Sequence, residues 1–133
     1  MNLKACFLHS TTDVRTPQAI LDMVRAEFGD FDDPCPLHGT GGLQRDWNSP
    51  AYVNPPYGRE TGKWIQKAIE EHNKGKTVIM LLPARTDLAW FHNLILPNAQ
   101  EIRFIKGRIK FEGYTTGAPF PSMLVIFKSE EAR

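Results

Sequence analysis

Four consecutive residues, Asn54, Pro55, Pro56 and Tyr57, carry groups that could activate an amino group for chemistry. An amino nitrogen attached to a base or an amide is a poor nucleophile, because its lone pair is delocalised into the neighbouring π-system. Two acceptors aimed at its two hydrogens, the Asn54 side-chain oxygen and the Pro55 carbonyl, would localise that lone pair toward an electrophile. The Tyr57 ring offers a face on which a planar group can stack. A sulfonium methyl would suit as electrophile, since its attack needs no strong base.

The same segment, extended by Gly58, is also a good turn sequence, because paired prolines stiffen a loop and Asn and Gly favour turns. It follows residues 51–53, which we predict to be a short strand. In open α/β sheets, ligands lie outside the carboxyl ends of strands. Its position therefore favours a functional site over a plain turn.

The length and composition limit the classes of protein that the chain can be. Its 133 residues suit one compact domain, residues 1–133, with a single core. No apolar run approaches the roughly 18 residues of a membrane span, and the start of the chain does not resemble a secretory signal, so we expect a soluble, cytoplasmic protein. Residues 1–50 carry four Lys/Arg against seven Asp/Glu, and the remainder twelve against eight. An anionic partner would prefer the second part of the chain.

The spacing of apolar residues predicts alternating helices and strands. Three helices are expected, one starting at Thr16–Pro17 with Thr16 as N-cap, one around Trp64–Ile69, and one from Asp87 to Pro97. Besides 51–53, strands are expected at residues 77–82, 100–105, 108–111 and 123–127. This order predicts an α/β sheet with helical crossovers and an antiparallel edge at the C-terminus.

Two cysteines cannot form a framework of disulfides, but each is followed three residues later by a histidine. The four residues are Cys6, His9, Cys35 and His38. Formally this is a ligand set for tetrahedral zinc, although the spacing is not that of a zinc finger and the apolar content suffices for folding without a metal. We predict no metal site and keep zinc as an alternative.

A series of short motifs runs along most of the chain. In order they are TPQ at 16–18, EFG at 27–29, DP at 33–34, DW at 46–47, NPPYG at 54–58, LLPARTD at 81–87, WFH at 90–92, RFIKGR at 103–108 and PFPS at 119–122. Together they resemble the phage-type, Dam-like DNA N6-adenine methyltransferases. NPPY alone would be shared with amino-methyltransferases that act on RNA guanine or protein glutamine, so the later motifs carry the resemblance to this family.

The resemblance implies a trimmed Rossmann-like methyltransferase sheet and S-adenosylmethionine as cofactor. Thr16 and Pro17 would lie near the methionine end of the cofactor, Asp33 would bind its ammonium group, and Asp46 would reach its adenine. From the residues alone, Asp32 is as good a candidate as Asp33. For Asp46, the capping of a helix or turn stays an alternative.

The catalytic segment takes its roles from the same resemblance. Asn54, Pro55 and Tyr57 would hold an adenine flipped out of DNA, and Pro56 would line the cofactor side. In a phage-encoded protein, the cytoplasm would be that of the bacterial host.

The chain is shorter than the family pattern ahead of this segment. Only residues 34–53 separate Asp33 from Asn54, so at least one strand–helix unit is expected to be missing. Glycines at 39, 41 and 42 are either the remnant of a cofactor loop or a plain flexible loop. No acidic residue for the ribose is evident, and a second copy of the chain, in a homodimer, could complete the site.

We expect no separate target-recognition domain, and we therefore expect DNA contacts to come from loops. The predicted DNA-binding residues are Arg59, Lys63, Arg85, Lys106, Arg108 and Lys110. The last three would lie in a basic hairpin, for which a solvated edge strand is the alternative. Arg85 could face the substrate or pair with Asp87.

The sequence therefore predicts methylation of the N6 amino group of adenine in DNA. One alternative keeps the chemistry but moves the substrate to RNA or a protein glutamine. Another is a non-catalytic DNA-binding module, or a zinc-stabilised one, that has lost the cofactor.

Overall fold

A four-stranded sheet forms the centre of the computed structural model, which describes residues 16–36, 41–110, 118 and 120–129. In sheet order the strands are β1 (Ala51–Val53), β2 (Val78–Pro83), β4 (Ser122–Phe127) and β3 (Glu101–Phe104). β1 and β2 are parallel, whereas β4 is antiparallel to both β2 and β3. Asp32 adds a parallel bridge to Ala51 on the outer side of β1. The predicted α/β sheet is confirmed, and the C-terminal strand is antiparallel as predicted, but β4 lies between β2 and β3 and not at the edge of the sheet.

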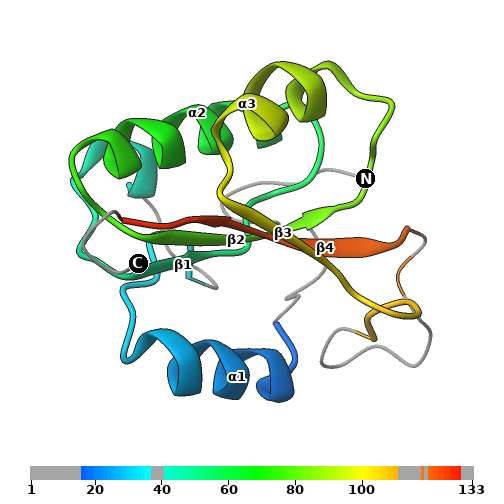
Figure 1. Cartoon of the computed structure of the whole chain (residues 1–133), viewed down its shortest axis with the longest axis horizontal. Helices are drawn as coiled ribbons and strands as arrows, with labels where there is room; N and C mark the ends of the chain where they lie inside the picture. The colour runs from blue at the N-terminus through cyan, green and yellow to red at the C-terminus, as the bar shows by residue number, and fades with distance from the viewer. Residues whose placement is uncertain (1–15, 37–40, 111–117, 119, 130–133) are drawn as a thin grey trace.

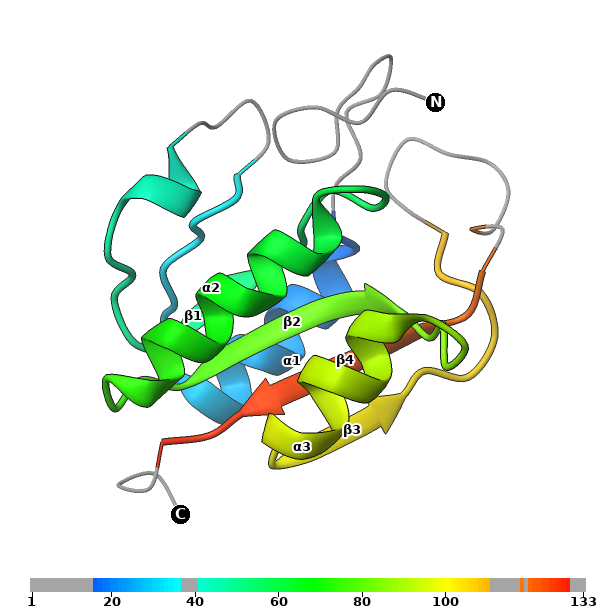
Figure 2. The same cartoon turned by 90° about the horizontal axis from the view of Figure 1, so that it is seen from above.

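Helices cover both faces of the sheet. α1 (Gln18–Phe28) lies on one face, and α2 (Thr61–Asn73) lies on the other together with η2 (Phe91–Ile95) and α3 (Leu96–Asn98) (Figure 1). Seen from above, α2 and α3 both lie on the near side of the strands (Figure 2). Every long strand is thus covered from two sides.

The two layers of helices explain the apolar run of β2. Val78, Met80 and Leu82 pack into the cluster on the α2 side, and Ile79 and Leu81 pack into the cluster on the α1 side. All five side chains are fully buried. A strand covered on both faces is expected to be apolar throughout, and not to alternate.

α1 is confirmed as a helix, but it begins differently from the prediction. Pro17 occupies the N-cap position, and no side chain caps the helix. The Thr16 hydroxyl bonds instead to Tyr52 and Asn54, so the predicted cap is wrong. The helix ends at Gly29, whose φ of 93° suits glycine.

α2 is confirmed and begins directly after the turn of residues 54–58. The Thr61 hydroxyl donates to the Pro56 carbonyl (2.8 Å) and accepts from the Gly58 amide (2.9 Å). α2 therefore fixes the end of this turn through its first residue. It also connects two parallel strands, which is the predicted helical crossover.

The third predicted helix begins with a π-helical turn. η2 is π-helical and continues directly into α3, which ends at Asn98. No side chain caps η2, and Asp87, the predicted cap, accepts two hydrogen bonds from Arg85. The helix is confirmed, and its predicted cap is wrong.

The C-terminal strands agree with the prediction except in one place. β3 and β4 are confirmed, but residues 108–110 form no strand, and residue 111 lies outside the described residues. The predicted basic hairpin is therefore wrong as a pair of strands. Its described part is irregular and is joined to Ala118 by two hydrogen bonds, from the Ala118 amide to the Ile109 carbonyl (2.8 Å) and from the Arg108 side chain to the Ala118 carbonyl.

The segment ahead of β1 is short, as predicted. Between Asp33 and β1, the described residues contain the single 3-10 turn η1 (Gly42–Gln44) and neither a further strand nor an α-helix.

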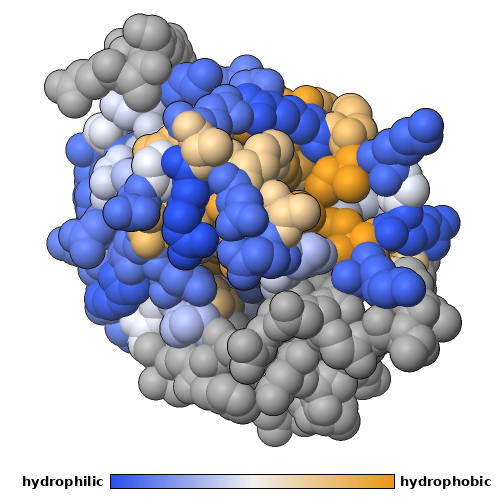
Figure 3. All heavy atoms as spheres, turned by 90° about the horizontal axis from the view of Figure 1, so that it is seen from below, coloured by the Kyte–Doolittle hydropathy of each residue, from blue (hydrophilic) through white to orange (hydrophobic). Residues whose placement is uncertain are grey.

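The described surface on the α1 face is mainly hydrophilic, with apolar patches between the polar side chains (Figure 3). Among the described helices, none is long and apolar enough to cross a membrane.

Candidate active site

Most of the predicted site residues gather at one edge of the sheet. Asp33 follows the bridge residue Asp32, Asn54 follows β1, and Ala84 follows β2. β3 runs in the same direction as β2, because both are antiparallel to β4. The carboxyl ends of all these segments therefore meet at one edge, here called the carboxyl edge, where ligands bind in open α/β sheets.

Asn54 is buried at this edge, and both ends of its carboxamide are hydrogen-bonded. Nδ2 donates to Thr16 Oγ1 (3.2 Å), and Oδ1 accepts from the Tyr57 hydroxyl (3.2 Å). An amide oxygen has two lone pairs. Oδ1 can therefore accept a second hydrogen bond while the one from Tyr57 is kept.

The two prolines differ in how their carbonyls are used. The Pro56 carbonyl accepts the hydroxyl of Thr61. Pro55 is buried, and no donor within the described residues reaches its carbonyl. Buried carbonyls are usually hydrogen-bonded, so this one is an acceptor available to a ligand beside Asn54.

Tyr57 is held tightly in its present position. Its hydroxyl contacts Asn54 Oδ1 and the Leu81 carbonyl (3.4 Å), and Phe120 meets its ring edge-on at 5.1 Å between ring centroids. Burial raises the pKa of its hydroxyl well above the usual value. Only 9% of the residue is exposed, so a base that stacks here must first displace neighbouring side chains.

Thr16 lies beside Asn54, and its contact with the methionine end of the cofactor stays a prediction. Its Oγ1 is 2.9 Å from the Tyr52 hydroxyl and accepts from Asn54. Pro17, half-buried, begins α1 next to it. The sequence analysis did not name Tyr52 as a site residue. It could have done so, because residues two apart in a strand share a face, which places Tyr52 with Asn54.

The two candidate carboxylates after the bridge strand have different surroundings. Asp32 accepts two hydrogen bonds from Arg45 and one from the Asn48 amide, which hold its pKa below the usual range. Loss of water around the Asp33 carboxyl, and the charge of Asp32, raise the pKa of Asp33 to about 6.

The remaining contacts of Asp33 leave it accessible. It accepts one hydrogen bond, from the Cys35 amide (3.1 Å), and no Lys or Arg among the described residues forms an ion pair with it. Although neighbouring groups crowd the carboxyl, the residue as a whole is exposed. Asp33 is therefore the better placed of the two for a cationic ligand.

Asp46 lies away from Asn54 and the residues bonded to it. Its carboxylate is exposed and pairs with Lys74 (3.0 Å), just beyond the last turn of α2. This turn leads into the amino end of β2, which is the opposite edge of the sheet. Asp46 as a cofactor ligand stays a prediction.

Trp47, next to Asp46, is anchored by a buried carboxylate. Glu71 accepts the Trp47 amide hydrogen (2.9 Å) and ion pairs from Lys67, Lys74 and Lys76. Burial alone would raise the pKa of Glu71, but these hydrogen bonds lower it far below its usual range. The segment ahead of β1 is thereby fixed to α2.

The predicted DNA-binding cations follow the carboxyl ends of three strands. Arg59 and Lys63 lie after β1, Arg85 after β2, and Lys106, Arg108 and Lys110 after β3; all are exposed. Arg85 pairs with Asp87, which was one of its two predicted roles, and Arg108 donates to the Ala118 carbonyl (3.3 Å).

The zinc alternative falls mostly outside the described residues, since only Cys35 of its four ligands lies within them and Cys6, His9 and His38 do not. Among the described residues, no group of three or more His, Cys, Asp or Glu side chains is arranged to hold a metal ion.

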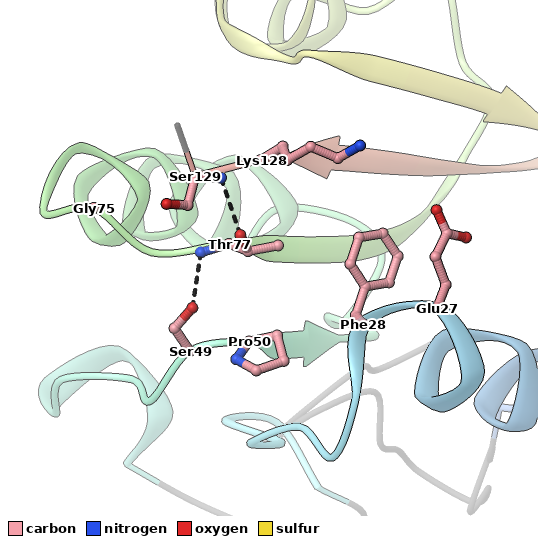
Figure 4. Close-up of a pocket in the computed structure, with 8 residues that line it drawn as sticks. All are labelled: Glu27, Phe28, Ser49, Pro50, Gly75, Thr77, Lys128 and Ser129. Atoms are coloured by element: carbon pink, nitrogen blue, oxygen red, sulfur yellow. Dashed lines mark hydrogen bonds between the residues drawn. The ribbon is translucent and has the colours of Figure 1, made fainter. Parts of the chain in front are cut away.

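A separate hollow lies at the opposite edge of the sheet (Figure 4). Its lining residues are Glu27, Phe28, Ser49, Pro50, Gly75, Thr77, Lys128 and Ser129. Thr77 binds Ser49 through its amide and the Ser129 amide through its hydroxyl. None of the predicted site residues lines this hollow, which separates it from the carboxyl edge.

Known proteins resemble the chain over most of its length. The family model of DNA N-6-adenine-methyltransferase (Dam) matches residues 37–133. A DNA N-6-adenine-methyltransferase of Escherichia phage T1 is 30% identical over 105 residues, covering 68% of this chain and 43% of that relative. The chain thus spans less than half the length of this relative, and no solved structure matches it. The chain belongs to the DNA N-6-adenine-methyltransferase (Dam) family.

Proposed function

We propose that this chain transfers a methyl group from S-adenosylmethionine to the N6 amino group of adenine in DNA. The observation that carries the proposal is the pair of buried acceptors at the end of β1: Asn54 Oδ1, with spare capacity, and the Pro55 carbonyl, without a donor among the described residues. Family membership supports the same substrate.

The two acceptors give the amino group its reactivity. One N6 hydrogen donates to Asn54 Oδ1 and the other to the Pro55 carbonyl, which draws the nitrogen lone pair out of conjugation with the ring. S-Adenosylmethionine supplies an electrophilic methyl on a sulfonium sulfur. In the transfer, the carbon–sulfur bond of the methyl group would break as the bond from N6 to that carbon forms; S-adenosylhomocysteine would be the leaving group, and the proton lost from N6 would pass to solvent.

The cofactor would lie between the start of α1 and the end of the bridge strand. Asp33 fits its ammonium group, because the residue as a whole is exposed and no described cation forms an ion pair with it. Thr16 bonds to the Tyr52 hydroxyl, whose pKa is raised by burial and, to a lesser degree, by the charge of Asp33. The proposed contacts of Thr16 and Pro17 are with the methionine part. This donor set suits a cationic amino acid group better than a phosphate, so it agrees with S-adenosylmethionine.

The base would stack on Tyr57 after leaving the DNA helix. Because Phe120 covers the Tyr57 ring edge-on, base entry requires Phe120 to shift. The exposed cations after β1 and β3 lie at this same edge and are suited to neutralise phosphates. A Rossmann-like origin of the sheet is part of the proposal, since its parallel segments all end at the site.

A methyl-transfer assay tests the proposal. Labelled S-adenosylmethionine and unmethylated duplex DNA are incubated with the protein, and the digested nucleosides are identified by mass spectrometry. We expect N6-methyladenine with the wild type and none with Asn54→Ala, whose fold should persist. Transfer to RNA or to a protein glutamine would support the alternative substrates. Lack of both transfer and S-adenosylhomocysteine binding would support a non-catalytic module.

The homodimer is tested separately. A second copy of the chain is proposed because the short segment ahead of β1 offers no evident acidic residue for the cofactor ribose. Mass measurement by light scattering, with and without S-adenosylhomocysteine, distinguishes one copy from two. A monomer that binds the cofactor tightly would contradict it.

A further inference from the structure

Asn54 poses a problem of orientation at the proposed site. Its carboxamide has an oxygen and an NH₂ group of similar size, and only the oxygen can accept a hydrogen from N6. A carboxamide turned by 180° would present a donor to the substrate and block the reaction. Something in the protein must therefore set the direction of this group.

The Thr16 hydroxyl is the partner of the nitrogen end. Asn54 Nδ2 donates to Thr16 Oγ1 at 3.2 Å, and both residues are buried. A hydroxyl, however, can donate as well as accept. Thr16 fixes the carboxamide only if its own hydrogen is engaged elsewhere.

Tyr52 offers a partner for that hydrogen. Its hydroxyl lies 2.9 Å from Thr16 Oγ1. When Thr16 donates to Tyr52, the remaining lone pairs of Oγ1 face Asn54 and accept only from Nδ2. The resulting chain runs from the Asn54 NH₂ group to Thr16 and on to Tyr52.

Two further observations support this assignment. α1 lacks a side-chain cap, so the Thr16 hydroxyl is directed to Asn54 and Tyr52 in place of the helix. Tyr52 is 2% exposed as a residue, and its ring packs against Phe31 at 5.4 Å between centroids. Its hydroxyl is therefore held at a fixed position.

We propose that Tyr52, acting through Thr16, is a positioning residue that turns the Asn54 carboxamide with its oxygen toward the adenine amino group. The role rests on the proposed function and deepens it. Neither hydroxyl needs to touch the base for this effect.

Tyr52→Phe is the principal test, because it removes one hydroxyl and keeps the buried ring. We expect kcat to fall about tenfold, the effect of one lost hydrogen bond, with KM for DNA and S-adenosylhomocysteine affinity unchanged. Thr16→Val should lose activity likewise, and Thr16→Ser should restore it. Ser49→Ala, which removes a bonded hydroxyl at the opposite edge, serves as the control and should keep the wild-type kcat.

A second background separates orientation from general stability. In Asn54→Asp both side-chain ends are oxygens, so no direction needs to be chosen. Tyr52→Phe should lower kcat much less in the Asn54→Asp background than in the protein with Asn54. An equal fold-change in kcat in the two backgrounds would overturn the proposal.

A third measurement needs no turnover. The side-chain NH₂ signals of Asn54, observed by ¹⁵N NMR without substrate, should shift in Tyr52→Phe and stay in place in Ser49→Ala. If the wild type is active, unchanged Asn54 signals or an unchanged kcat in Tyr52→Phe would overturn the positioning role. A wild type that forms no N6-methyladenine would instead reject the proposed function.

Discussion

The Pro55 carbonyl and the Asn54 oxygen are unequal partners for a substrate. The former has no donor among the described residues, whereas the latter is already shared with the Tyr57 hydroxyl. Residue types alone predicted both acceptors. They could not predict the bond from Tyr57, because it depends on how the turn brings the Tyr57 hydroxyl to Asn54.

Substitution of Tyr57 separates stacking from hydrogen bonding. We expect Tyr57→Ala to weaken DNA binding by roughly 1–3 kcal/mol, the contribution of one stacked base, and Tyr57→Phe to keep the wild-type affinity because the ring remains. Fluorescence titration of a duplex that contains the target base measures both variants. An equal loss in both would contradict a stacking role.

Asp33 should make cofactor binding depend on pH. With a pKa of about 6, its carboxyl is protonated below that pH and then attracts an ammonium group poorly. The affinity for S-adenosylhomocysteine should therefore rise as the pH increases through about 6. Calorimetry from pH 5 to pH 8 measures this, and Asp33→Asn should bind weakly with a flat profile across that range.

The same shift predicts an opposite trend in stability. The folded pKa is raised from 3.8 to about 6, so the folded state binds this proton more tightly than the unfolded state does. Stability from this group is present below about 3.8 and is lost as the pH rises through about 6. Thermal unfolding of the unliganded protein should show the loss, and Asp33→Asn should lack it.

At the scale of elements, α2 holds both its preceding turn and the segment around Trp47. Hydrophobic periodicity predicted α2, because Trp64, Ile65 and Ala68 share its buried face. The same reasoning could not place Asp46, since that depends on a long-range bond between the Trp47 amide and Glu71.

Glu71→Ala should destabilise the protein strongly. It leaves three lysines facing one another and the buried Trp47 amide without its acceptor. Breaking a buried ion pair costs about 3–5 kcal/mol, and we expect a loss near the lower end because Lys74 is half exposed and can return to water. Urea unfolding measures it, with the exposed Glu70→Ala on the same helix as control. Similar losses in both variants would contradict the anchoring role.

At the scale of the whole molecule, the exposed cations at the carboxyl edge mark the side that should face DNA. The sequence alone names these cations as candidates for DNA binding, whereas their location at one edge follows from the directions of the strands. Over residues 108–110 the predicted strand is wrong: charged and apolar residues alternate there like those of an edge strand, but the chain is hydrogen-bonded to Ala118 instead.

Removal of two of these charges should weaken DNA binding in a salt-dependent way. We expect Lys106→Ala with Lys110→Ala to lower the slope of log affinity against log salt by about 2, close to one unit for each phosphate that is no longer neutralised. Lys128→Ala at the opposite edge should leave the slope unchanged. An unchanged slope in the double variant would mean that DNA binds to another face of the protein.

The paired acceptors at the end of β1 also bear on when the reaction stops. Two acceptors can be satisfied together only by a nitrogen that carries two hydrogens. After one transfer, N6 keeps a single hydrogen, and either Asn54 or Pro55 loses its donor. If the proposed transfer takes place, we therefore expect the protein to discriminate against its own product, releasing N6-methyladenine and forming no dimethylated base.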